Sequence, residues 1–454
     1  MAKAKKKKPA GQKIKLAGKD KKGQAVLVHL SVEGKKLITT TGQAWGGNKD
    51  KTKTFGTPDK AREAYDKALA GFVADGFREI GAIPDPAIPI ARDAKLEAAI
   101  RANREDAGAY MIYADWLQGQ GSPMGEMIAY AQRGQKKKAE NLAAKIGMPD
   151  PEFATVVFEH GLWKSLRINN DIDNMDDEWD PLPPIERLFA SPLCAVLDEL
   201  RIGMVRWEHY DQPAVIELAG KQAWAKDLRS LAVGDVGRNI DMNHHSIGDV
   251  GKRITKVFPN LESLFLHSGS QRWRSGEGFG TSGLELPTLK RLVVETCAMT
   301  AKRLKGFFGG LPNATFVELW FGDPDRDEPL ARAGDLMPVF TGAAFPKVTH
   351  LGLCNTKLVT EIVRFLPTTK IAKQLTELDL SRGTFWDEDA TELAAEAKAF
   401  PKLELLDVSR SWLTKAGVKT LKKAFPGVKL LVDDQEDPTN AEEDYGGRYV
   451  SVSE

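Results

Sequence analysis

A chain of 454 residues is too long for one compact core, and its length favours two to four units. The hydrophobic fraction of 42% and the charged fraction of 28% indicate a folded globular protein and exclude a disordered or fibrous one. The net charge of +1 conceals an asymmetry, because residues 1–80 carry 19 Lys and Arg against 8 Asp and Glu while the remainder is acidic. A basic N-terminal part of this kind favours a polyanionic partner.

No apolar run reaches the ~20 residues that a membrane-spanning helix needs. The lysine-rich residues 1–12 precede no apolar stretch, so they do not form a secretory signal, and we expect a basic disordered tail. The three cysteines are few and widely spaced, which favours reduced thiols over a disulfide framework. We therefore expect a cytoplasmic protein without membrane contact.

Residues 13–80 have the pattern of a small α+β domain. Apolar and polar residues alternate on both sides of Glu33-Gly34, which predicts a β-hairpin, and a third strand is expected to end at Phe55. Thr57 and Pro58 then have the positions of a helix cap and a first helical residue. The helix that follows places small and aromatic residues along one face, suited to cover a small sheet.

This stretch resembles a WGR domain, the module named for its Trp-Gly-Arg turn. Trp45 and Gly46 match that turn, Phe55 matches the strand end, and Gly76-Phe77 stands where Gly-Tyr is usual. In poly(ADP-ribose) polymerases such modules contact DNA through the Trp and the Arg. The resemblance therefore implies a nucleic-acid contact, DNA or RNA, in which Trp45 would stack on an exposed base or sugar.

The position of the family's Arg is occupied by Gly47, so other cations would have to meet the phosphates. Lys49, Lys51 and Lys53 alternate along one expected strand and would share a face of it. The alternative is structural: Trp45 fills the small core and the three lysines form a solvated face. Both interpretations stay open at this point.

The proline-rich residues 81–92 predict a linker, and residues 93–160 predict a small α-helical domain. This domain resembles the repeat-companion domain found beside leucine-rich repeats in bacterial proteins, on the YADWL core of residues 113–117 and the GSPMGE turn of residues 121–126. The family implies no chemistry. Asp115 and Glu126 could form an acid-base pair, but a helix cap and a hydrogen bond to a backbone turn are the simpler roles. The domain is also placed to cap the first repeat.

Residues 161–433 repeat the pattern LxxLxL at intervals near 28 residues, which indicates a leucine-rich repeat solenoid. Each repeat is long enough for a strand and a true helix, and in this it resembles the ribonuclease-inhibitor-like class of repeats. The expected fold class is therefore α/β, with a concave parallel sheet of ten strands. The first apolar position of each repeat is expected at Trp163, Leu197, Leu228, Leu261, Leu289, Phe316, Val348, Leu375, Leu403 and Val428.

The residues between the leucines should face outward from the concave sheet and offer a protein-binding surface, with Phe265 and Trp320 as exposed aromatic anchors. The full set expected to bind a protein partner is Phe265, His267, Arg291, Trp320, His350, Asp379 and Asp407. No phosphate loop, metal motif or catalytic signature is present, so we expect no cofactor, no metal and no catalysis.

Three functional hypotheses follow. The first is a protein-binding scaffold whose N-terminal domain adds nucleic-acid contact. The second is a protein-interaction module without nucleic-acid binding, and the third is an enzyme that uses Asp115 and Glu126. Residues 434–454 are acidic and are expected to be a disordered tail, which would screen the last strand edge or fold back on the basic N-terminal part.

Overall fold

The structure is a computed structural model. It describes residues 13–19, 25–43, 49–79, 91–149, 151, 153–168, 180–205, 211–236, 246–269, 279–322, 330–437 and 447–452. The chain divides into two compact units, one of residues 1–85 with 148–153 and one of residues 86–147 with 154–454.

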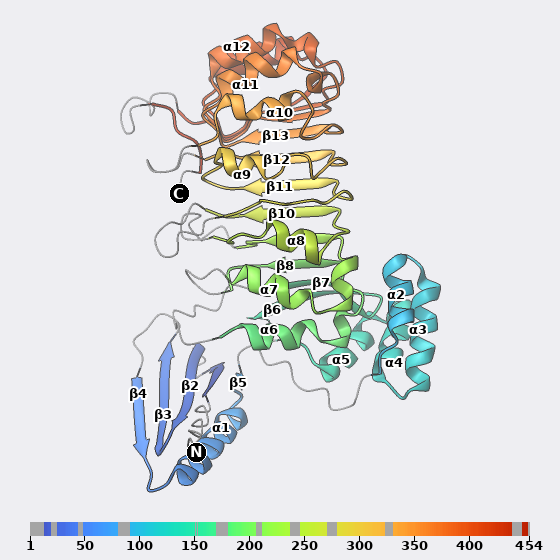
Figure 1. The fold of residues 1–454 in the computed structure, drawn as a ribbon, viewed down its shortest axis with the longest axis vertical. Coiled ribbons are helices and arrows are strands. Elements are labelled where there is room, and N and C mark those ends of the chain that lie inside the picture. Colours follow the sequence, from blue (N-terminus) through green and yellow to red (C-terminus); the bar gives the residue numbers. More distant parts are fainter. Residues whose placement is uncertain are drawn as a thin grey trace, which may run out of the picture. The chain divides into compact units, whose positions relative to one another are not determined.

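The first unit contains a five-stranded antiparallel sheet in the order β4-β3-β2-β1-β5 (Figure 1). The hairpin predicted around Glu33-Gly34 is present, since β2 and β3 flank that turn and Gly34 has a φ of +58°. The sequence pattern missed the first and last strands. The strands are β1 Lys13–Lys19, β2 Ala25–Glu33, β3 Lys36–Gln43, β4 Lys49–Thr54 and β5 Arg78–Glu79.

One helix, α1 (Pro58–Ala74), covers this sheet. It begins as predicted, because the Thr57 side chain accepts a hydrogen bond from the Lys60 N–H at 3.3 Å and Pro58 is its first residue. Its apolar face buries Tyr65 against the strands. The core of the unit consists of Leu16, Val26, Val28, Leu30, Leu37, Tyr65 and Phe77.

The second unit is built on an eleven-stranded sheet that runs in chain order from β6 to β16. Strand β6 (Ala154–Glu159) is antiparallel to β7, and the ten strands from β7 onward are parallel, as the repeat pattern predicts. These ten are β7 Leu162–Ile168, β8 Glu199–Ile202, β9 Ser230–Val233, β10 Ser263–His267, β11 Arg291–Glu295, β12 Phe316–Trp320, β13 His350–Cys354, β14 Glu377–Asp379, β15 Leu405–Asp407 and β16 Lys429–Leu431.

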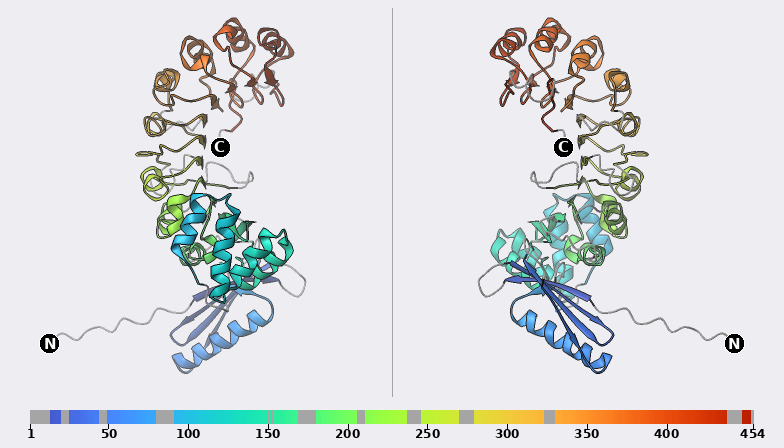
Figure 2. Two further views of the ribbon diagram at one scale, coloured as in Figure 1. Left: turned by 90° about the vertical axis from the view of Figure 1, so that its right-hand side faces the viewer. Right: turned by 90° about the vertical axis from the view of Figure 1, so that its left-hand side faces the viewer.

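Within this unit the strands line the inner side of an arc and the helices form its outer side (Figure 2). A single strand and helix cannot bury their own apolar faces, so each repeat depends on its neighbours for its core. The outer helices are α6 Leu182–Phe189, α7 Gln212–Ala219, α8 Gly251–Val257, α9 Ala301–Lys305, α10 Met337–Phe340, α11 Val359–Phe365, α12 Asp387–Ala395 and α13 Lys415–Ala424.

The repeat alignment is wrong at two positions, Phe316 and Val428. In the last repeat the register pairs Leu405 with Lys429, so Gly427 and not Val428 is the equivalent of the inner residue Leu403. Phe316 was assigned to the inner apolar site, but the register pairs it with Arg291 and His350, whose side chains face the concave surface. The fully buried residue at the inner site is Ala314. The sequence alignment chose the larger apolar residue. The alternation of residues 316–319 instead places Phe316 on the concave face of the strand, away from the core.

Four helices precede the solenoid: α2 Ala94–Ala102, α3 Ala107–Gly119, α4 Pro123–Gln132 and α5 Lys136–Ile146. The predicted helical domain extends too far, because residues 154–159 form β6. His160 and Gly161 between β6 and β7 both have positive φ, the conformation of a two-residue hairpin turn that suits the strand twist. The edge of the first repeat is therefore paired by a strand and not covered by helices alone.

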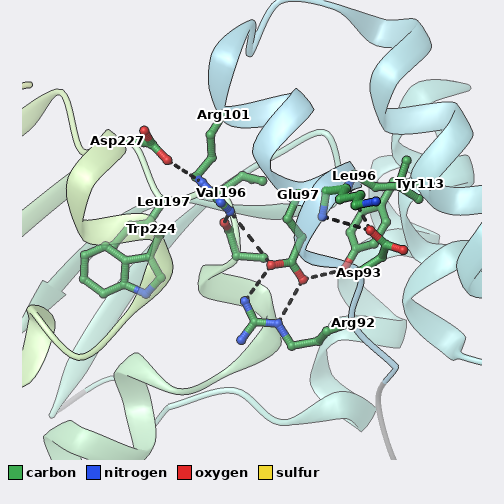
Figure 3. Close-up of polar contacts among 12 residues, drawn as sticks. Arg92, Asp93, Leu96, Glu97, Arg101, Tyr113, Val196, Leu197, Trp224 and Asp227 are labelled. Carbon is green, nitrogen blue, oxygen red and sulfur yellow. Dashed lines mark hydrogen bonds and ion pairs between the residues drawn. The ribbon is translucent and has the colours of Figure 1, made fainter.

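Helix α2 carries a buried ionic cluster centred on Glu97, whose side chain is almost completely buried (Figure 3). Arg92 donates two hydrogen bonds to it, at 2.9 and 2.8 Å, and the Tyr113 hydroxyl donates a third at 2.9 Å. Burial, together with the negative charge of Glu97, raises the pKa of Tyr113, so the phenol stays a donor. A buried carboxylate is tolerated here because its lone pairs are satisfied.

Two further arginines join α2 to the first repeats. Arg101 donates to the Asp227 carboxylate at 2.7 Å and to the Ala195 carbonyl at 2.8 Å. Arg104 donates to the backbone carbonyls of Leu197, at 3.1 Å, and Asp227, at 2.7 Å. Burial lowers the pKa of Arg104. These contacts satisfy carbonyls at the turns that lead into β8 and β9.

None of the helices among the described residues combines the length and the apolarity that a bilayer crossing requires.

Candidate interaction surface

The inner face of the second unit's sheet presents side chains in columns that run across the strands. Because the strands pair in register, every second residue of one strand has an equivalent neighbour on the next. From β8 to β16, one column contains Glu199, Ser230, Ser263, Arg291, Phe316, His350, Glu377, Leu405 and Lys429. The next contains Arg201, Ala232, Phe265, Val293, Glu318, Gly352, Asp379, Asp407 and Leu431.

Four members of the first column form a stacked ladder. The Arg291 guanidinium lies 3.6 Å from the centre of the Phe316 ring, and the His350 ring stacks on Phe316 with 3.6 Å between centroids and 8° between planes. His350 Nδ1 lies 2.7 Å from a carboxylate oxygen of Glu377. These contacts restrict rotamers, so a partner would meet a preorganised aromatic and charged surface.

Beside the ladder, small side chains leave a hollow of about 300 Å³. Ser230, Ala232 and Ser263 contribute little side-chain volume to it, while Arg291 and Glu318 add charged groups of both signs. Phe265 lines the hollow and is half-buried. An aromatic group with charges of both signs around it is suited to a protein side chain.

Charged side chains lie on the early and on the late strands of the sheet. In the early repeats Arg167 and Arg201 both donate to Asp235, at 2.6 and 2.7 Å. Burial acts to raise the pKa of Asp235, but the hydrogen bonds from the two arginines outweigh it and the pKa is lowered. In the late repeats Asp379 and Asp407 are register neighbours on β14 and β15.

The late acidic residues lie near a buried thiol. Ligand atoms of Glu318, Cys354 and Asp379 lie within 4.8 Å of one another, the spacing of possible metal ligands. Burial raises the pKa of the Cys354 thiol, and its sulfur contacts the Asp379 carbonyl at 3.8 Å, so the thiol is a packed donor and not a thiolate. The cluster has no feature beyond proximity that indicates a metal site.

The predicted protein-binding residues share the concave face but differ in exposure. Phe265 stacks on His267 with 6.3 Å between centroids, and His267 Nδ1 lies 3.0 Å from Glu295. Trp320 was expected to be exposed, but only 8% of it is accessible. Its indole donates to Glu318 at 2.8 Å, and the Arg382 guanidinium lies 4.9 Å from its ring centre.

Of the two predicted anchors, Trp320 is therefore buried against expectation, whereas Phe265 is half-buried and lines the hollow. Phe316, missed because it was assigned to the core, is half-buried at the centre of the ladder and is a better anchor than Trp320. The signal that could have found it is Ala314, an acceptable inner residue placed before an alternating strand.

Of the predicted nucleic-acid-binding residues, Trp45 and Gly46 lie outside the described residues. Lys49, Lys51 and Lys53 lie on β4, an edge strand on which every residue is exposed. The Lys53 ammonium is 5.4 Å from the centre of the Phe55 ring. The alternation of the three lysines along a strand is thus present, and their side chains are accessible.

Asp115 and Glu126 are both exposed, on α3 and α4 respectively. Glu126 accepts a hydrogen bond from the Tyr130 hydroxyl at 2.9 Å, one helical turn away. Neither of the simpler roles expected for the pair, a helix cap and a bond to a backbone turn, is the contact that Glu126 makes. Exposed carboxylates lack the desolvation that usually prepares a general acid.

Comparison with solved structures shows a likeness of fold. A protein of Bacteroides fragilis is similar to this chain with a TM-score of 0.50 and 16% identity, over 98% of this chain and 100% of that chain. An internalin of Listeria monocytogenes matches with a TM-score of 0.30 and 11% identity, over 67% and 89% of the two chains, too weakly to bear on fold or function. No protein-family model and no curated protein matches the chain. The second unit is an α/β solenoid of the leucine-rich repeat type.

Proposed function

We propose that this protein is a non-catalytic scaffold that holds a protein partner on the concave face of its repeat sheet. The observation that carries the proposal is the ladder of Arg291, Phe316, His350 and Glu377 beside a hollow of about 300 Å³. The ladder is rigid, combines aromatic and charged groups, and stands on a scaffold of ten parallel strands. These properties are those of interface hot spots.

The test starts from partner capture with the full chain as bait, followed by affinity measurements on the purified partner. We expect Phe316→Ala and Arg291→Glu each to weaken binding at least tenfold, about 1.4 kcal/mol or more, because hot-spot truncations cost that much. Phe365→Ala is the matched control, since Phe365 is an exposed aromatic on the outer helix α11. Equal recovery and affinity for all three variants would contradict a concave binding site.

A second function, nucleic-acid contact by the first unit, is supported by the lysines of β4 and by the resemblance to WGR domains. Lys49, Lys51 and Lys53 are all exposed on one edge strand, where a phosphate backbone could reach them. Asp50 lies among them and reduces, but does not cancel, their charge.

We expect the full chain to bind duplex DNA or RNA with an affinity that falls steeply as salt rises, by a logarithmic slope of about −0.9 for each phosphate contact on DNA. Changing all three lysines to Glu should abolish binding. Changing Lys60 and Lys67 of α1 to Glu, which alters the charge of the same unit elsewhere, should preserve most of it. An affinity that is absent or independent of salt leaves the protein-binding function alone.

A further inference from the structure

The last described residues of the chain, 447–452, return to the solenoid and lie beside the carboxyl ends of its late strands (Figure 1). The Ser451 N–H donates to the Arg382 carbonyl at 2.9 Å, and its hydroxyl donates to the Arg410 carbonyl at 3.1 Å. The expectation of a disordered acidic tail is wrong for these residues. They contact the turns that follow β13, β14 and β15, and residues 438–446 lie outside the described residues.

The solenoid residues that bind the segment occupy the same position in successive repeats. Asn355, Arg382 and Arg410 occupy equivalent places just after β13, β14 and β15, and all three have a left-handed φ between 51° and 65°. Their N–H groups continue the ladder of the sheet. The backbone carbonyls of Arg382 and Arg410 accept hydrogen bonds from Ser451. In the preceding repeat the side chain of Asn355, and not its carbonyl, binds the segment.

Asn355 binds the segment as one strand binds another. Its amide nitrogen donates to the Val452 carbonyl at 2.7 Å, and its oxygen accepts from the Val452 N–H at 2.9 Å. A paired donor and acceptor recognise any extended backbone, whatever its side chain. The Asn355 side chain is fully buried, so it is held in place for this contact.

Apolar and aromatic pockets supply the side-chain selectivity. Val450 is 1% exposed, and Val452 packs against the buried Cys297 and Ala298. The Trp412 indole donates to the Tyr449 carbonyl at 3.0 Å, with the two rings edge to face. The Arg448 guanidinium lies 3.5 Å from the centre of the Trp386 ring.

We propose that this strip, lined by Asn355, Arg382, Trp386, Arg410 and Trp412, is a peptide-binding groove that residues 447–452 occupy as an internal competitor. Its external ligand is an extended segment of another protein with the pattern basic, aromatic, aliphatic, small, aliphatic. That ligand binds by displacing the chain's own segment. The groove lies past the strand ends and is distinct from the concave ladder, so the inference does not rest on the proposed function.

The mode of contact makes the segment exchangeable. Four of its five hydrogen bonds use backbone groups that every extended peptide possesses, the fifth uses the Ser451 hydroxyl, and only Val450 is fully buried. Such a short segment holds its place chiefly through the high effective concentration, on the order of millimolar, that its covalent attachment provides. A free ligand with a few additional contacts outside the segment overcomes that advantage.

The test uses a fluorescein-labelled peptide of residues 445–454, YGGRYVSVSE, and measures its anisotropy. We expect it to bind a chain that ends at Asp437 and to bind the full chain about tenfold more weakly or not at all, because the groove is already occupied. A peptide N-methylated at Ser451 loses the bond to the Arg382 carbonyl and should bind the shortened chain at least tenfold more weakly. Asn355→Gly in the shortened chain keeps the left-handed φ, removes the clamp and should have the same effect.

A second variant protects the test against misfolding of the shortened chain. In the full chain, Val450→Glu with Val452→Glu should release the segment without shortening the protein and restore binding of the peptide. The proposal is overturned if the folded shortened chain and this double variant both fail to bind the peptide. It is also overturned if the unaltered chain binds the peptide as tightly as they do, since its groove would then be free.

Discussion

Asp379 and Asp407 are neighbours on adjacent strands, and each accepts a 2.8 Å hydrogen bond from a backbone N–H two residues later, Ser381 and Ser409 respectively. Burial, and then the negative charge of Asp407, raise the pKa of Asp379 to about 6. The folded state therefore holds a proton on Asp379 that the unfolded chain, with an ordinary pKa near ~3.9, gives up at lower pH. Stability contributed by the protonated carboxyl is present below about pH 4 and is lost as pH rises to about 6.

Replacing Asp379 with Asn should remove this penalty. The amide keeps an oxygen to accept the Ser381 N–H, and above pH 6 it removes a charge that is half-buried beside another. We expect the free energy of unfolding to rise by about 1–2 kcal/mol at pH 7, less than the full pKa shift implies because solvent reaches part of the group. Urea unfolding of both proteins from pH 4 to pH 8 measures the difference, which should be small at pH 4 and constant above pH 7. Asp407→Asn should give a gain of the same sign, because it removes the repulsion on Asp379; a loss in both variants would mean that the carboxylates stabilise the late strands.

At the scale of elements, the sequence predicts a strand wherever a repeat ends in alternating leucines, because burial of one face of a parallel strand imposes a period of two. This succeeds even in the irregular early repeats, where Trp163, Leu166 and Ile168 occupy the inner positions of β7. It fails at Phe316, because the pattern favours a large apolar residue and does not record which face of the strand its side chain occupies. A residue as small as Ala314 can fill the inner site when neighbouring repeats supply the volume.

The sequence could not predict β1, β6 or the docked C-terminal segment for a different reason. β6 is defined by its pairing with β7. In β1, Ile14 and Leu16 do alternate with lysines, but the pattern is too short to indicate a strand without its partner β2. The segment 447–452 contains too few apolar residues to indicate burial. Its contacts depend on carbonyls at Arg382 and Arg410 that become available only when the repeats stack. Local patterns do not contain such non-local geometry.

On the scale of the molecule, α2 joins the second unit into one body. Glu97 is neutralised within the helical part, while Arg101 and Arg104 reach into the turns before β8 and β9. Stacked repeats need a polar cap at each end, because an end repeat has no neighbour to satisfy its backbone groups. In this chain a hairpin strand covers the edge of the sheet, and arginines of a helix satisfy the turn carbonyls.

Removing one of these arginines should therefore destabilise the whole junction between α2 and the first repeats. In Arg104→Leu, the carbonyls of Leu197 and Asp227 and the carboxylate of Asp198, 3.2 Å from Arg104, lose a buried cationic donor. We expect a loss of about 3 kcal/mol in the free energy of unfolding, in the range for breaking a buried ion pair. Hydrogen exchange should quicken first in α2 and in the turns before β8 and β9. Arg364→Leu is the control, because Arg364 donates two hydrogen bonds to the Glu392 carboxylate on the exposed outer helices. Solvent screens that pair, so its loss should leave hydrogen exchange in α2 unchanged. Equal effects of the two substitutions would show that the buried junction does not hold the helical cap in place.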